Sequence, residues 1–293
     1  MPHCDCNKFI EIFQRFRHKL YTILPNRRDS LMDLLDALSS NQTARSPVEL
    51  SLNPLFRRNY SALYKAVAQF NFNPDGASGL DENSGSPEAF EQLKKQQSLQ
   101  QLIAEIIPAP EQRLFYLFGL DVTPIPRPYA QTLEERTFIY QPNPIKGNKP
   151  INIGHPYSIL SVLPERTDAQ PAPWCIPLSA QRVLPTQKGT EVGSAQLENA
   201  FFNLQLPQDS LCVLVADSDY STPVFLNENL ERDNLVIVTR VRSNRVFYLQ
   251  PNPCEIKTFR RGHPRWYGNK FDLFRYLSIL SSTFRLGTFV AFW

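Results

Sequence analysis

The stretches that decide the fold are RLFYLFGLDV, residues 113–122, and LCVLVADSDYS, residues 211–221. Each begins with an apolar run of the length and composition of a buried β-strand. Each run is followed by an aspartate, Asp121 in the first stretch and Asp217 in the second. Two carboxylates that the fold brought together would repel each other unless a cation lay between them. The stretches therefore predict two core strands and a candidate divalent-metal site at Asp121 and Asp217.

The same aspartates also have a purely structural interpretation. An aspartate directly after a strand is often a turn former or a helix cap. Spacing alone leaves the metal site and the turn as open alternatives.

Three more segments have the composition of strands, residues 151–163, 173–183 and 235–249, and Pro-rich turns separate them. An amphipathic helical pattern over residues 194–204 precedes the strand at 211–216. Strands in sequence, then a helix and a buried strand, are typical of a mixed sheet flanked by helices. We therefore predict the α/β class for this part of the chain.

The first 70 residues show helical periodicity instead. Apolar residues recur at three- and four-residue steps from Phe9 to Leu24, from Leu31 to Leu38 and from Leu55 to Val67. We expect Asp29 and Ser30 to cap the second of these helices. The segment NFNPDGASGLDENSGSP, residues 71–87, has no apolar period and is rich in turn formers, which indicates an exposed linker. A helix over residues 88–107 is expected to open the α/β region.

Charge is distributed unevenly along the chain, although the net charge is only +3. Residues 1–65 contain ten Lys and Arg and six Asp and Glu, and residues 235–293 contain ten Lys and Arg and two Asp and Glu. Residues 66–234 contain eleven Lys and Arg and twenty Asp and Glu. Basic ends around an acidic middle suit a protein that holds a phosphate backbone. The five cysteines do not form the pattern of a disulfide framework, so we do not expect an extracellular protein. Arg275 and Arg285 interrupt the apolar C-terminal stretch, so we do not expect a membrane anchor.

Six motifs occur together and in order between Leu114 and Leu273. They are GLDVTP from Gly119, RTFIYQPNPIKGNKPINIGHPYS from Arg136, PWCIPLSAQRV from Pro173, VADSDYSTPVFL from Val215, NLVIVTRVRSNRVFY from Asn234 and RGHPRWYGNKFDL from Arg261. This series resembles the catalytic region of insertion-sequence DDE transposases.

The resemblance implies a ribonuclease H-like fold with Asp121 on the first strand and Asp217 just after the fourth. It also implies that these two residues bind Mg²⁺ or Mn²⁺. The implied partner is DNA, namely the terminal repeats and the target DNA, and a homodimer is one possible form of the protein. The domains expected are a DNA-binding helical domain over 1–70, a linker over 71–87, a catalytic domain over 88–273 and an atypical tail over 274–293. A bacterial protein associated with the nucleoid in the cytoplasm is expected.

The resemblance also implies a third carboxylate, usually Glu, on a later helix, and here the sequence departs from the family. After Asp272 the chain reads LFRYLSILSSTFRLGTFVAFW and contains no further Asp or Glu. We therefore expect a truncated or frameshifted, catalytically incomplete transposase.

Several other polar residues are candidates for binding. Lys146 and Lys149 flank a glycine in IKGNKP, and Arg240 and Arg242 alternate on a predicted strand, so these four are expected to contact DNA. His155 is interpreted as structural. Tyr220 and Ser221 are not expected to be covalent nucleophiles, because no Arg and His constellation accompanies them.

Three function classes remain open from the sequence. The first is a metal-dependent DNA endonuclease and transposase, and the second is a non-catalytic DNA-binding fragment that regulates an intact transposase. The third is an unrelated α/β enzyme whose aspartates are caps, although neither G-x-x-x-x-G-K nor G-x-S-x-G occurs.

Overall fold

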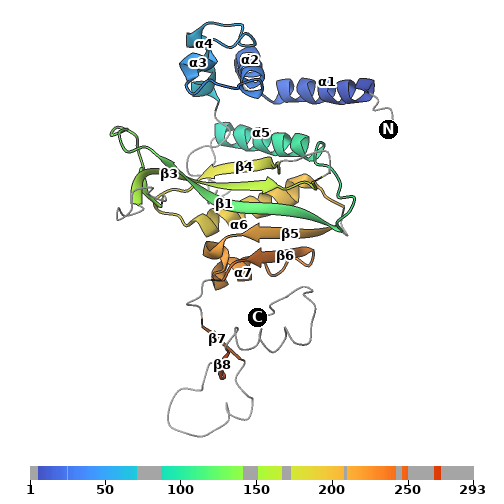
Figure 1. Ribbon diagram of the computed structural model, residues 1–293, viewed down its shortest axis with the longest axis vertical. Helices are drawn as coiled ribbons and strands as arrows, with labels where there is room; N and C mark the ends of the chain where they lie inside the picture. Colours follow the sequence, from blue (N-terminus) through green and yellow to red (C-terminus); the bar gives the residue numbers. More distant parts are fainter. Residues whose placement is uncertain are drawn as a thin grey trace. The chain divides into compact units, whose positions relative to one another are not determined.

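The computed structural model describes residues 6–24, 26–70, 87–140, 151–166, 173–207, 210–241, 246–249 and 267–271. The chain divides into two compact units, residues 1–239 and residues 240–293. Figure 1 shows the helices and the main sheet of the first unit and the short strand pair of the second.

Four helices form the N-terminal part of the first unit. They are α1 (Cys6–Ile23), α2 (Arg28–Ser39), α3 (Pro47–Leu50) and α4 (Tyr60–Gln69). Asn59 caps α4 by accepting a hydrogen bond from the backbone of Ala62 at 3.1 Å. The expected caps of the second helix are wrong, because α2 begins at Arg28 and Asp29 lies in its first turn, where it accepts a hydrogen bond from Tyr21. The three predicted helices are otherwise present, and α3 is an addition.

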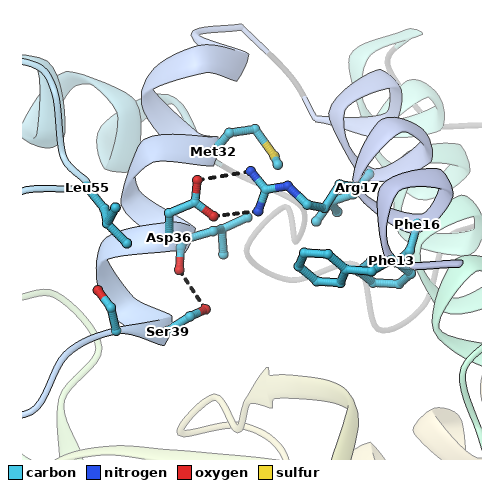
Figure 2. Close-up of a pocket in the computed structure, with 10 residues that line it drawn as sticks. Phe13, Phe16, Arg17, Met32, Asp36, Ser39 and Leu55 are labelled. Carbon is cyan, nitrogen blue, oxygen red and sulfur yellow. Dashed lines mark hydrogen bonds and ion pairs between the residues drawn. The ribbon is translucent and has the colours of Figure 1, made fainter. Parts of the chain in front are cut away.

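Ion pairs join these short helices. The Asp33 side chain, 2% exposed, pairs with Arg57 at 2.7 Å and with Arg58 at 3.2 Å. Arg17 and Asp36 form two hydrogen bonds, of 2.5 and 2.9 Å, between α1 and α2. Figure 2 shows this second pair at a cavity of about 410 Å³ between the same two helices, lined mainly by apolar side chains.

The main sheet has six strands. They are β1 (Phe115–Pro126), β2 (Thr137–Tyr140), β3 (Ile151–Val162), β4 (Ile176–Arg182), β5 (Leu211–Ala216) and β6 (Leu235–Thr239). Their order is β2-β3-β1-β5-β6, and β4 also pairs with β3. Strands β1, β3 and β4 are antiparallel neighbours, whereas β5 and β6 run parallel to β1. Three antiparallel strands, a helix and two strands parallel to the first make the ribonuclease H-like arrangement, so the predicted fold class is confirmed.

Helices cover one face of this sheet. They are α5 (Pro87–Ala104), α6 (Gly189–Leu204) and α7 (Pro223–Asn229), with a short 3₁₀ helix, η1 (Ser218–Tyr220), before the last. The buried core lies between the sheet and α6 and includes Phe118, Leu120, Leu160, Leu197, Leu214 and Phe225. Asn203 of α6 donates a buried hydrogen bond to Gln100 of α5 at 2.6 Å, which joins the two helices.

The opposite face of the sheet remains accessible within the described residues. Val215 on β5 is 41% exposed and Val238 on β6 is 50% exposed. Since side chains alternate between faces along a strand, the residues that alternate with the buried core positions lie on this face. This alternation decides where the two aspartates lie.

Two strands differ from the sequence prediction. Strand β2 was not predicted, because four residues are too short for a clear alternating pattern. The predicted strand at 235–249 is wrong as a single element, since β6 ends at Thr239, opposite the last residue of β5. In the second unit, β7 (Phe247–Tyr248) pairs with β8 (Lys270–Phe271). No helix of the described residues is long and apolar enough to cross a bilayer.

Candidate metal centre

Adjacent parallel strands bring Asp121 and Asp217 together. In the register of β1 and β5, Leu120 lies opposite Ala216, so the two aspartates occupy the next position on each chain. Figure 1 shows β1 and β5 side by side in the middle of the sheet. Neighbouring strands lie about 4.8 Å apart. The sequence prediction placed the two carboxylates together, and this register provides a physical basis for their proximity.

Because side chains alternate between the two faces of a sheet, both carboxylates lie on its open face, which is the face opposite the one that α6 covers. Leu120 is 2% exposed and Ala216 is 8% exposed, and both belong to the core under α6. The residues that follow them therefore point to the other side of the sheet, and both aspartates are exposed. A cation on the open face could reach both side chains without entering the core.

The backbone of Asp217 is fixed by a turn. Strand β5 ends at Ala216, and Asp217 is the cap of η1, with its Oδ1 accepting a hydrogen bond from the backbone N–H of Asp219 at 2.9 Å. The Thr239 hydroxyl, at the end of β6, donates to the carbonyl oxygen of Asp217. The structural interpretation, a cap after a strand, is therefore correct for Asp217. It does not exclude metal binding, because the cap uses only one carboxylate oxygen.

The donor set suits a small hard cation. Mg²⁺ is commonly bound by one or two carboxylates, and its remaining ligands are water molecules and phosphate oxygens of the substrate. Two exposed carboxylates on adjacent strands provide this arrangement, and the close approach of two negative charges favours a cation. Among the described residues, no cluster of three or more His, Cys, Asp or Glu side chains is present.

Tyr220 lies beneath the pair, at the end of η1. Its side chain is 1% exposed and packs edge-on against Phe225, with ring centroids 5.0 Å apart. Burial raises the pKa of Tyr220 well above its usual range, a side-chain hydrogen bond with Ser158 partly offsets this rise, and the charges of the nearby aspartates add to it. The phenol therefore stays protonated, and its burial argues against a role as a covalent nucleophile.

A buried polar network holds α6 to the sheet at the same level. Gln196 accepts a hydrogen bond from the Ser158 hydroxyl at 2.6 Å and donates to the Ser158 carbonyl at 3.0 Å and to the Ser179 hydroxyl at 2.9 Å. Val122, the residue after Asp121, lies opposite Ser158 in the sheet. The network therefore ties β3, β4 and α6 together next to the aspartates.

Comparison with known proteins identifies the family. A family model described as DDE superfamily endonuclease matches residues 19–282, which include both aspartates. The chain belongs to the DDE superfamily endonucleases. Members of this superfamily usually use divalent metal ions, in agreement with the chemistry of the two carboxylates.

Two other comparisons give less information about this DDE endonuclease. A cryo-EM structure of the piggyBac transposase synaptic complex with hairpin DNA is similar at 13% sequence identity and a TM-score of 0.36, over 75% of this chain and 43% of that chain. The chain thus spans less than half the length of that transposase. No curated protein matches the sequence.

The predicted DNA contacts are only partly described. Lys146, Lys149 and Arg242 lie outside the described residues, and Arg240 is exposed directly after β6. Arg240 was expected on a strand together with Arg242. The strand ends one residue earlier, because β5 offers no partner beyond Ala216.

His155 is structural, as expected. It is 6% exposed, and its Nε2 lies 2.9 Å from the carbonyl oxygen of Glu134. Among the acidic residues after Asp217, Glu228 accepts a hydrogen bond from Ser194 at 2.7 Å, and Glu255 and Asp272 lie outside the described residues.

Sequence reasoning missed the layer beneath the aspartates. Tyr220 was considered only as a nucleophile, and Gln196 and Ser158 were not singled out. Gly193 directly precedes the helical pattern predicted over residues 194–204, and only the structure places it inside α6, where a glycine often indicates a close approach. A Cβ atom on Gly193 would lie 2.9 Å from Leu120 Cδ2 and 3.0 Å from Tyr220 Cε1.

Proposed function

We propose that this DDE endonuclease cleaves phosphodiester bonds in DNA, with Mg²⁺ or Mn²⁺ held by Asp121 and Asp217. The observation that carries the proposal is the register of β1 and β5, which places the two carboxylates at neighbouring positions on the exposed face. A bound divalent metal would supply activation of the attacking oxygen and stabilisation of the leaving oxygen.

The protein's own residues would hold and orient this site. Asp121 pairs with Ile159 of β3 and directly follows Leu120, the last residue of β1 that pairs with β5, so the sheet holds its backbone. Asp217 keeps one oxygen in the cap of η1, which fixes the side-chain direction and leaves the second oxygen for the metal. Both groups face solvent, so a DNA phosphate has access to them.

We further propose that the biological reaction is transposition of a bacterial insertion sequence, with strand transfer after cleavage. The order of the six motifs supports this proposal, because it resembles insertion-sequence transposases. In this proposal Lys146, Lys149, Arg240 and Arg242 contact the DNA backbone, residues 1–70 bind the terminal repeats, and two copies act as a homodimer on DNA in the nucleoid. The basic character of residues 1–65 is consistent with DNA binding.

A second candidate is a DNA-binding regulator without cleavage activity. The proposed site has two carboxylates, and the part of the chain that the structure describes contains no cluster of three or more His, Cys, Asp or Glu side chains. A metal held by two protein ligands would be bound weakly, and cleavage by this chain would then be slow or absent. The catalytic part would in this case serve to pair with an intact transposase.

The test is cleavage of labelled insertion-end DNA with Mg²⁺ or Mn²⁺ by the parent, Asp121→Asn and Asp217→Asn. Asp233→Asn, a change of the same kind at an exposed position, is the control. Cleavage by the parent and the control, with loss in both site variants, would support cleavage at the two aspartates.

The remaining outcomes separate the candidates. A parent that does not cleave but binds the DNA with strong salt dependence supports the regulator. Binding that survives deletion of residues 1–70 would rule out their role in recognition. If the parent neither cleaves nor binds DNA, both candidates are refuted.

A further inference from the structure

The apolar face of α1 takes no part in the proposed metal site. Phe9, Phe13, Phe16 and Leu20 recur at steps of four, three and four residues, so they lie on one face of the helix. One end of this face is covered, because Leu20 packs on the buried cluster that includes Met32 of α2. At the other end, Phe9 is 62% exposed and Phe13 is 58% exposed. A contiguous apolar face that continues into solvent is typical of an interaction site.

The cavity of about 410 Å³ between α1 and α2 adjoins this face (Figure 2). Its apolar lining consists of Phe13, Phe16, Leu20, Met32, Leu35 and Leu55. An apolar cavity of about 150 Å³ can hold a benzene molecule, so this one has room for a phenyl ring from another molecule. The charged side chains in its lining, Arg17 and Asp36, are paired with each other at 2.9 Å. The described lining therefore suits an apolar group and offers no unpaired cation to a phosphate.

A projecting ring and a cavity that can receive it thus occur on the same surface of one chain. Phe9 is the most exposed phenylalanine of α1 and lies about one turn before Phe13. In a two-fold symmetric dimer, a side chain of each copy meets the same pocket of the other. If two α1 helices run antiparallel and cross near Phe13, each Phe9 lies level with Arg17 of the other copy, which lines the cavity. Two-fold symmetry can therefore fill both cavities at once.

The exposed apolar area is sufficient for a weak dimer. The side chains that contribute are 36–62% exposed, and they are Phe9, Ile10, Phe13, Leu35 and Leu55. With about 200 Å² for a large apolar side chain, they expose about 500 Å² per copy, or about 1,000 Å² in a dimer. This area is near the lower limit for a specific interface. A dimer of this size should dissociate in the micromolar range.

We propose that the exposed end of the α1 face and the adjoining cavity form the interface between two copies of this chain, with Phe9 of each copy seated in the cavity of the other. The inference deepens the homodimer of the proposed function and rests on that part of it. Because Arg17 and Asp36 neutralise each other, two identical surfaces meet there without a net repulsion of like charges.

The test is sedimentation of the full chain without DNA at concentrations of about 1–100 µM. We expect a monomer–dimer equilibrium that high salt does not weaken, because the interface is apolar. Phe9→Ser should raise the dissociation constant about 30-fold or more, because both copies lose a buried ring. Phe202→Ser, which changes a phenylalanine of α6 that is 76% exposed, is the matched control and should leave the dissociation constant unchanged.

A pair of complementary variants tests the contact itself. Phe9→Lys and Leu55→Glu should each weaken self-association, because each introduces a charge into an apolar interface. A mixture of the two should form heterodimers more readily than either variant forms homodimers. In the heterodimer the introduced lysine meets the introduced glutamate in one cavity, and an unchanged Phe9 fills the other. Both positions are exposed, so the melting temperature of each variant should match that of the parent.

Other results would overturn the inference. A parent that remains monomeric at about 100 µM, or a Phe9→Ser variant that dimerises like the parent, refutes it. Loss of DNA binding by Phe9→Ser with unchanged self-association would assign the face to DNA and also refute it.

The variant Asp121→Asn separates this interface from the proposed cleavage. It should self-associate like the parent, because Asp121 lies on the sheet and not on α1. Cleavage that does not depend on Asp121, together with a dimer that depends on Phe9, would refute the metal site and support the interface. Cleavage that depends on Asp121, from a chain whose self-association does not depend on Phe9, would support the metal site and refute the interface.

Discussion

Replacement of Asp33 by asparagine should destabilise the N-terminal helices far more than the same replacement at Asp36, three residues along α2. The Asp33 side chain is 2% exposed and has two guanidinium partners, Arg57 and Arg58. Removing one partner of a buried ion pair costs about 3–5 kcal/mol. The Arg57 side chain is 76% exposed and recovers part of its hydration when the pair is lost. We therefore expect Asp33→Asn to lower the free energy of unfolding of these helices by about 2–4 kcal/mol.

Asp36 provides the matched control. Its side chain is 30% exposed and that of its partner Arg17 is 34% exposed, so solvent screens the pair. We expect Asp36→Asn to lower the free energy of unfolding by about 0.2–1 kcal/mol. The two variants should then differ by about 2 kcal/mol, which is roughly a 30-fold difference in local opening.

Hydrogen exchange of the backbone amides, read by mass spectrometry, measures this local stability directly. Amides of α2 and α4 should exchange about 30-fold faster in Asp33→Asn than in Asp36→Asn, whereas amides of β5 should be unchanged in both. High salt should remove most of the Asp36 effect and little of the Asp33 effect. Equal effects of the two variants would refute the argument that burial of Asp33 makes its ion pairs important.

Two further predictions concern titratable groups in the first unit. Backbone N–H groups of Arg113, Gln112 and Glu111 donate to the Glu165 carboxylate and hold its pKa below the usual range. A depressed folded-state pKa stabilises the protein above the unfolded-state pKa, and this contribution is lost as the pH falls through the folded-state pKa. Glu165→Gln should therefore lower the melting temperature at neutral pH and flatten its fall on the acid side, and an unchanged acid slope would contradict this. Burial raises the pKa of the Cys212 thiol to about 11, so in the native protein an alkylating reagent should modify the exposed Cys175 and leave Cys212 unmodified, as peptide mapping would show.

The main features of the fold could be predicted from the sequence because they depend on long apolar runs. The runs around Phe118 and Leu214 bury both strands in the core, and a buried strand has a recognisable composition. Short or interrupted elements could not be predicted, since β2 has four residues and the end of β6 depends on where β5 ends. The end of β6 is therefore set by the pairing in the sheet and not by the residues around Thr239.

The proximity of the two aspartates could be predicted, but the residues packed near them could not. Asp121 and Asp217 follow apolar runs in the sequence, whereas Tyr220 and Gln196 lie in the core between the sheet and α6 because of the way that the helix packs on the sheet. A tyrosine three residues after an aspartate has no pattern of its own. Its place in the core is visible only in the structure, where its side chain is 1% exposed.

The two carboxylates are constrained in different ways, and this difference bears on how each would bind a metal ion. Asp217 lies at a strand end, where the turn and its cap fix both the backbone and one side-chain oxygen. Asp121 lies inside β1 and pairs with Ile159 of β3, which fixes its backbone, whereas its side chain lies on an exposed face. A metal ion can orient that side chain only after it has bound.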